Sequence, residues 1–128
     1  MGYMAHHAIL VTSHNKDLIA DARDEALFIV GQTSTTATPV MDVSGIVGSW
    51  VNGYRSFFIA PDGSKAGWAE SLRGDEQRAL FIAWLESKRY EDGSSSIQWA
   101  EVLYGTDDPT VEPAAVLHSS DYGGNDGD

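Results

Sequence analysis

Three groups of polar residues in this sequence have types or spacings that can support chemistry. The first is the run Ser13-His14-Asn15-Lys16, which contains an S-x-x-K spacing where a predicted strand meets a predicted helix. Ser13, His14 and Lys16 would hold an anion at the helix N-terminus, or the Ser-Lys pair would carry out acyl transfer. The S-D-N and K-T-G motifs that accompany this spacing in serine penicillin-recognising enzymes are absent. We therefore favour helix capping by Ser13 or Asn15.

The second group is an acidic stripe that recurs at helical spacing, formed by Asp17, Asp21, Asp24 and Glu25. A solvated helix face is the usual explanation of such a pattern. The alternative is an array that imitates nucleic-acid phosphates and occupies the basic groove of a partner protein. Small acidic cysteine-free proteins of phage and mobile elements act as inhibitors in this way, although the comparison is by type and involves no motif.

The third group is the four histidines, His6, His7, His14 and His118. His6 and His7 would point to opposite faces of a strand, so they cannot easily bind one metal ion together. The sequence has no HExxH motif, no acidic calcium-loop spacing and no cysteine. We therefore predict no metal site, no cofactor and no catalytic residues, and we do not expect an enzyme.

Charge narrows the range of partners. The sequence carries 19 acidic residues against 8 Lys and Arg, a formal net charge of −11, and residues 101–128 contain no Lys or Arg. Such a balance repels phosphate backbones and anionic membranes, so we expect neither direct nucleic-acid binding nor membrane binding. The sequence shows neither a signal peptide nor a membrane-spanning run, and this predicts a cytoplasmic protein.

The elements that would position these residues follow from hydrophobic periodicity and turn signals. We expect strands at 5–12, 39–47 with a bulge at Ser44-Gly45, 54–60 and 96–104, and helices at 16–30 and from Asp75-Glu76 to Lys88-Arg89. Asn52-Gly53 would form a hairpin turn, and residues 111–117 would add a short edge strand.

This order is β-α-β-β-α-β, which predicts an α+β fold with the ferredoxin-like split βαβ topology. Two right-handed crossovers would place both helices on one face of an antiparallel sheet. We expect a single domain over residues 1–118. The acidic residues 119–128 contain almost no apolar side chain, so we expect them to lack fixed structure.

Residues 52–63 are predicted to form a turn, a strand and a second turn, and we place this strand, the strongest predicted one, at the centre of the sheet. Its alternation places Tyr54 and Phe58 on one face and Phe57 and Ile59 on the other, so both faces carry large apolar groups. The same stretch superficially resembles the RNA-recognition motif of this topology. However, Asn52 replaces the basic residue and Ser56 replaces the second stacking ring, which argues against RNA binding.

A sheet covered on one side only should present polar residues to water. We therefore expect a non-catalytic interaction module whose open sheet face is buried by a second copy or by a partner protein, with Tyr54, Phe58 and Trp99 at the contact. The alternative is that exposed aromatic residues are tolerated and partly covered by the C-terminal segment. An acidic inhibitor that acts through the helix stripe is the second functional hypothesis, and a small enzyme or anion binder that uses Ser13, His14 and Lys16 is the third.

Overall fold

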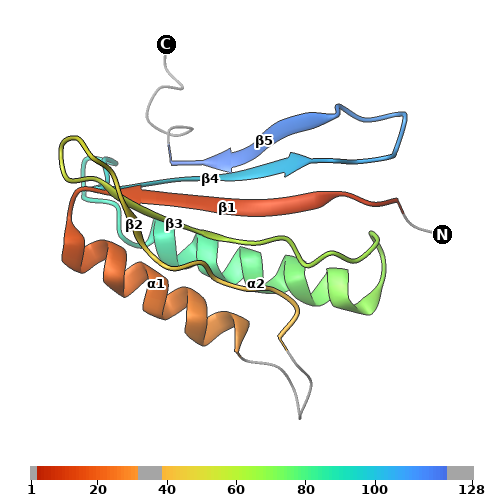
Figure 1. Cartoon of the computed structure of the whole chain (residues 1–128), viewed down its shortest axis with the longest axis horizontal. Coiled ribbons are helices and arrows are strands. Elements are labelled where there is room, and N and C mark those ends of the chain that lie inside the picture. The colour runs from red at the N-terminus through yellow and green to blue at the C-terminus, as the bar shows by residue number, and fades with distance from the viewer. Residues whose placement is uncertain (1–2, 32–38, 121–128) are drawn as a thin grey trace.

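The computed structural model describes residues 3–31 and 39–120, which form five strands and two helices (Figure 1). The strands are β1 (His6–Ser13), β2 (Val47–Gly48), β3 (Arg55–Ile59), β4 (Ile97–Tyr104) and β5 (Ala114–Ser119), and the helices are α1 (Lys16–Val30) and α2 (Ala69–Glu86). The strands form one sheet in the order β2-β3-β1-β4-β5, with every neighbouring pair antiparallel. The predicted α+β class is confirmed, and the predicted C-terminal edge strand is present as β5.

The centre of the sheet is β1, which pairs with β3 on one side and along its whole length with β4 on the other. The prediction that the strand within residues 52–63 lies at the centre of the sheet is therefore wrong. This strand is present as β3, but it lies between β1 and the two-residue edge strand β2. β5 extends the sheet beyond β4 and moves its centre away from β3.

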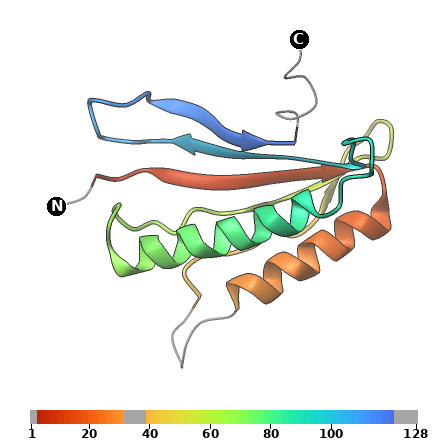
Figure 2. The ribbon, with the colours of Figure 1, turned by 180° about the vertical axis from the view of Figure 1, so that it is seen from behind.

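Both helices pack on the same face of the sheet (Figures 1 and 2). Alternate strand residues point into the core between the sheet and the helices. From the strands the core contains Ile9, Val11, Phe57, Ile59, Ile97 and Trp99, and from the helices it contains Ile19, Ala22, Ala26, Ile29, Val30, Phe81 and Leu85. This is the layer arrangement expected when a sheet buries one face under amphipathic helices.

Helix α1 matches its predicted range of 16–30. Asn15 caps it, because the Asn15 side chain accepts hydrogen bonds from the backbone N–H groups of Asp17 and Leu18 at 3.1 and 3.0 Å. This satisfies two of the N–H groups that have no partner within the helix. Gly31 follows as the C-cap, as predicted.

Helix α2 begins at Ala69, earlier than the predicted start at Asp75. Gly74 lies within it, although glycine in a helix interior costs about 1 kcal/mol relative to alanine. A Cβ atom on Gly74 would overlap the carboxylate of Asp62 and would lie close to the guanidinium of Arg78. The missing side chain therefore allows an ion pair to form against the helix, which is a tertiary effect that local propensity does not contain.

The segment from residue 39 to 46 runs beside β3 without a regular ladder, so the predicted strand over 39–47 is wrong for most of its length. Its bulge is as predicted: the Phe58 N–H donates to Ser44 Oγ at 2.8 Å, where a carbonyl would otherwise accept. The hairpin turn is confirmed as well, since Asn52 and Gly53 both have positive φ angles, 65° and 68°.

The last strand ends close to residue 118, where the predicted domain ends. β5 continues through Ser119, and the Ser120 N–H donates to the carbonyl of Trp99 at 2.9 Å. Residues 121–128, where most of the predicted tail falls, lie outside the described residues. In the part of the chain that the structure describes, no helix combines the length and hydropathy needed to cross a membrane.

Candidate functional site

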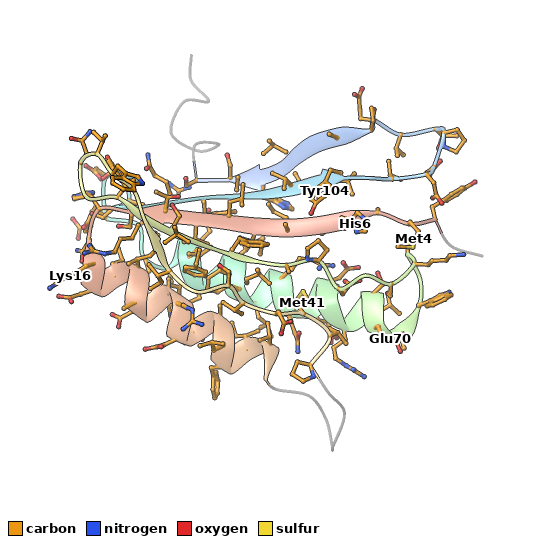
Figure 3. All side chains as sticks on the ribbon, viewed as in Figure 1. Met4, His6, Lys16, Met41, Glu70 and Tyr104 are labelled. Carbon is orange, nitrogen blue, oxygen red and sulfur yellow. The ribbon has the colours of Figure 1, made fainter. Side chains whose placement is uncertain are left out.

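The face of the sheet opposite the helices carries exposed apolar side chains. Leu10 on β1 and Phe58 on β3 are register partners, and they are 49% and 40% exposed. A shallow cavity of about 290 Å³ lies beside them, and its lining includes Thr12, Ser44, Val47 and Ser56. At the far end of this face the rings of His6 and Tyr104 lie side by side, with centroids 5.4 Å apart (Figure 3). We call this surface the open face.

The open face carries no formally charged strand residue. Within β1 to β5 the only Asp, Glu, Lys or Arg residues are Arg55 and Glu101. Arg55 pairs with the buried Ser13 and Glu101 pairs with the buried Ile9, so both belong to the helix side of the sheet. The strands therefore present an uncharged surface on a chain of net charge −11.

The hairpin between β2 and β3 extends the exposed apolar surface. Trp50 is fully exposed, and Val51 beside it is largely exposed. The backbone that carries them is held by hydrogen bonds from the Ser49 N–H to the Tyr54 carbonyl and from Ser49 Oγ to the Val51 carbonyl. Tyr54 itself, a predicted partner-binding residue, is partly exposed and makes an edge contact with the ring of His14.

Trp99 does not accompany Phe58 on the open face, where the prediction of a partner contact had placed it. Its side chain is buried in the core on the helix side, one residue out of phase with the exposed positions of β4. The physical reason is the strict two-residue alternation of a strand: Ile97, Trp99 and Glu101 share one face.

The three residues of the predicted anion site do not form a common site. Ser13 is fully buried, and its hydroxyl donates to the Ser96 carbonyl at 2.6 Å and accepts from the Asn15 N–H at 3.0 Å. Lys16 projects from the first turn of α1 into solvent (Figure 3). His14 is also exposed. Ser13 joins two segments of the backbone, and this supports the capping interpretation of the run.

The acidic stripe lies on the outer side of α1, away from the sheet. Asp17, Asp21 and Asp24 are exposed, and Glu25 is half-buried. These four residues share a surface, as predicted, and the opposite side of the same helix supplies the core residues Ala22 and Ala26.

The structure brings together a charged cluster that the sequence did not reveal. Arg78 on α2 is 2% exposed, and its Nη2 lies 2.6 Å from Asp75 Oδ1 while Nη1 lies 3.2 Å from Asp62 Oδ2. Arg78 Nη1 also donates to the thioether of Met41, and Nε lies 3.8 Å from Glu101 Oε2. A buried guanidinium needs such partners because an unpaired charge in the interior is costly.

Glu101 on β4 links this arginine to two histidines. Its Oε1 lies 2.8 Å from His118 Nδ1, and its Oε2 lies 3.6 Å from His7 Nδ1. Burial raises the pKa of Glu101, but the hydrogen bond with His118 and the neighbouring imidazole of His7 outweigh burial and leave its pKa below the ordinary value. The side chain is thus an ionised carboxylate in a largely buried position.

The spacing of the histidines along the chain does not reveal that His7 and His118 share Glu101 as a partner. The useful signal was Glu101, the only acid in the strand predicted at 96–104. A lone carboxylate on a strand face that should be apolar calls for a cationic or hydrogen-bonding partner. Among the described residues no three or more His, Asp or Glu side chains are placed to hold a metal ion.

A cavity of about 540 Å³ opens beside this cluster, between α2 and strands β1, β4 and β5. Its polar lining is His7, Asp75, Arg78, Glu101 and His118, and its apolar lining is Ala79, Ile82, Ala83 and Leu117.

The chain is thus a small acidic α+β protein with an uncharged open sheet face on one side and a charged cluster beneath the helices on the other. No family model, no curated protein and no solved structure matches it.

Proposed function

We propose that this protein is a non-catalytic interaction module that pairs with a second copy of itself through the open face of its sheet. The observation that carries the proposal is the complete lack of charged strand residues on a face where Leu10 and Phe58 are exposed. Cores of protein interfaces are depleted of charge in the same way, and exposed apolar patches mark interaction sites.

A second copy suits this face better than a charged partner. Two chains of net charge −11 repel each other, so they can associate only where carboxylates stay apart. The open face meets that condition, because the charged side chains Arg55 and Glu101 belong to the helix side. A two-fold pairing would also bring identical patches together, which is the usual symmetry of homodimers.

The strands alone offer a modest area for pairing. Strands about 4.8 Å apart that contain 8, 2, 5, 8 and 6 residues of about 3.3 Å each give a face of roughly 460 Å². Two copies would bury roughly 900 Å² through the strands, below the roughly 1,200 Å² at which the range for specific complexes begins, so the pairing also needs contacts beside the sheet. The exposed Trp50 and Val51 of the hairpin would enlarge the contact.

Light scattering or sedimentation of the full chain tests the proposal, with a matched pair of variants. Phe58→Glu places a charge on the open face and should give a single species of 13.8 kDa. Phe28→Glu makes the same change on α1, where the ring is 63% exposed, and should leave the dimer intact. A wild-type chain shortened after Ser120 that stays monomeric at high micromolar concentration would contradict the proposal.

The acidic stripe supports a second candidate, an inhibitor that imitates nucleic acid and binds a basic groove of a partner protein. The favouring observation is that Asp17, Asp21 and Asp24 are all exposed on one side of α1. Such binding would weaken steeply as salt increases, whereas pairing through an uncharged face would not.

We also propose the ferredoxin-like assignment for the elements from β1 to β4, with β5 as an addition at the edge. Its support is the adjacency of β2, β3, β1 and β4 in one antiparallel sheet with both helices on one face. The departures from that pattern are the two-residue length of β2 and the presence of β5.

A further inference from the structure

The open face has a nearly palindromic pattern along the central strand of the sheet. Two-residue alternation places every second residue of β1, and the position that follows β1, on this face. These residues are, in order, His6, Ala8, Leu10, Thr12 and His14. A histidine lies at each end, a leucine lies in the middle, and a small residue lies between them on both sides. This pattern fits a two-fold axis that crosses β1 at Leu10, because the strand presents a similar surface in both directions.

Each of the two terminal histidines packs against a tyrosine. The ring centroid of His6 lies 5.4 Å from that of Tyr104, its register partner on β4 (Figure 3). Gly105 follows, and a Cβ atom there would lie 2.6 Å from the His6 ring, so the missing side chain makes room for this ring. At the other end of β1 the ring centroid of His14 lies 5.8 Å from that of Tyr54, which precedes β3. A histidine–tyrosine pair therefore lies at each end of β1, and the second pair lies beyond the strands.

The histidines on the two sides of the sheet differ in their ionic partners. On the helix side, His7 and His118 both lie beside the carboxylate of Glu101. In the part of the chain that the structure describes, no carboxylate forms an ion pair with His6 or His14. Histidine is the side chain that ordinarily gains a proton between about pH 8 and about pH 5. Acid would therefore place a positive charge without a partner at each end of β1.

Other charged groups near the ends of β1 do not supply the missing negative charge. Beyond the C-terminal end, Lys16 and the N-terminus of α1 add positive charge. Beyond the N-terminal end, Lys65 and Asp107 both contact Met4, and their opposite charges offset each other. The two tyrosines carry no formal charge.

We propose that two copies stack their open faces with their β1 strands antiparallel about a two-fold axis at Leu10, and that protonation of His6 and His14 separates them. This inference rests on the pairing proposed above and adds its geometry and its regulation. The axis also passes Phe58 and Ala100, the register partners of Leu10, so each of them faces its own counterpart. At both ends of the contact, His6 of one copy lies opposite His14 of the other. The copies overlap along the whole of β1, and the rings beyond the strand ends add the contact that the strands alone do not provide.

The effect of pH follows from the hydrogen-bonding groups of imidazole. A neutral ring has one donor and one acceptor nitrogen, so two neutral rings can share a hydrogen bond across the contact. Two protonated rings have donors only, and their like charges repel each other. Protonation also reduces the net charge of −11, which by itself would favour pairing of two acidic chains. A pairing that weakens in acid therefore has the opposite sign to the effect of net charge.

Sedimentation velocity of the full chain at about pH 8 and about pH 5.5 tests the proposal. The dissociation constant of the dimer should rise at least about tenfold at the lower pH, because like charges then face each other. The double variant His6→Gln with His14→Gln should pair without this rise, since amides do not titrate in this range. His118→Gln removes a histidine from the helix side and should keep the rise. The lower pH stays above 4.5, the ordinary pKa of a glutamate, so Glu101 remains ionised.

The outcomes separate this inference from the pairing itself. A dissociation constant that stays constant or falls in acid would overturn the role of the histidines, and so would a rise that persists in the double variant. In that case, a dimer at neutral pH that Phe58→Glu abolishes would still support pairing through the open face. A monomeric wild type at neutral pH would reject both.

An exchange of charges tests the antiparallel arrangement of the two β1 strands. Positions 6 and 14 lie roughly 26 Å apart on one chain at about 3.3 Å per residue, well beyond the Debye length of about 10 Å. His6→Glu and His14→Lys in the same chain therefore attract each other only across the dimer. Together they should give pairing at least about fivefold tighter than the two single changes predict if they act independently. Independent effects would overturn the contact between His6 and His14.

Discussion

Charged strand residues usually lie on the face of a sheet that meets water, but in this protein they lie on the face that the helices cover. The covered helix side contains a buried arginine, Arg78, and a nearly buried carboxylate, Glu101. The open face, which the fold leaves uncovered, has no charged strand residue and exposes Leu10 and Phe58. A single-layer sheet that met only water would be polar outside and apolar inside. The inversion supports the proposed pairing through the open face, whereas on the helix side the charged groups face one another.

The largest effect should come from removing the buried positive charge. Arg78→Met would leave the carboxylates of Asp62 and Glu101 in the interior without their guanidinium partner. We expect the free energy of unfolding to fall by roughly 4 kcal/mol, as found when one partner of a buried ion pair is removed. Urea denaturation followed by circular dichroism measures this loss.

The matched control for that change is Arg73→Met, which alters a half-buried arginine on the same helix. We expect it to cost no more than about 0.5 kcal/mol, because surface substitutions rarely cost more. Equal losses in the two variants would mean that the cluster contributes nothing beyond ordinary helix packing.

Adjacent phenylalanines on β3 compare the two faces within one strand. Phe57 is 3% exposed in the core, so Phe57→Ala should destabilise the monomer by roughly 3 kcal/mol. Phe58→Ala should cost the monomer less than about 1 kcal/mol but should weaken pairing by roughly 2 kcal/mol, as an interface anchor would. Unfolding midpoints measured over a range of protein concentrations separate the two effects, since dimer stability depends on concentration. Identical behaviour of the two variants would contradict the assignment of the faces.

Acid should remove the stabilisation that Glu101 provides. Burial raises its pKa, but the hydrogen bond with His118 and the nearby imidazole of His7 outweigh burial, so the pKa is lowered in the folded protein. A carboxylate with a lowered pKa stabilises the fold above its unfolded pKa, and that stability is lost as the pH falls through the folded value. Glu101→Gln should be about 2 kcal/mol less stable than wild type at neutral pH. The difference should shrink as the pH falls below 4.5, the ordinary pKa of a glutamate, and should disappear once Glu101 is protonated in the folded protein as well. A difference that stays constant to the lowest pH would contradict this role.

Local signals in the sequence predicted most of the secondary structure but not the sheet order. The caps of α1 and the Asn52-Gly53 turn depend on neighbouring residues only, and both were predicted correctly. The start of α2 was missed because Gly74 is tolerated for its contact with Asp62, which is far away in sequence. The central position of β1 depends on pairing with two strands that follow much later in the chain.

The residues of the candidate sites also divide into those that local patterns predict and those that only strand pairing brings together. The exposure of Phe58 follows from the two-residue alternation of a strand and was predicted. The same alternation places Trp99 in the core, but only once it is known which face of the sheet Ile97 and Glu101 occupy. The cluster around Arg78 joins residues from β1, β4, β5 and α2, and no spacing along the chain encodes their proximity. Strand register, which the sequence did not specify, is what brings His118 opposite Glu101.

The smallest expected effect is that of salt on self-association. Whether salt strengthens or weakens the dimer shows whether the contact lies on the open face or on the acidic stripe. Because the open face has no charged strand residue, raising salt from about 0.05 to about 0.5 M should change the dissociation constant of the dimer by less than about threefold. The change should be toward tighter pairing, since salt screens the repulsion between two chains of the same net charge.

Changing Asp17, Asp21 and Asp24 to Asn should not weaken pairing, because these side chains lie on the outer side of α1. Sedimentation velocity at several salt concentrations measures both. Pairing that weakens steeply with salt would instead assign the contact to charged groups outside the open face.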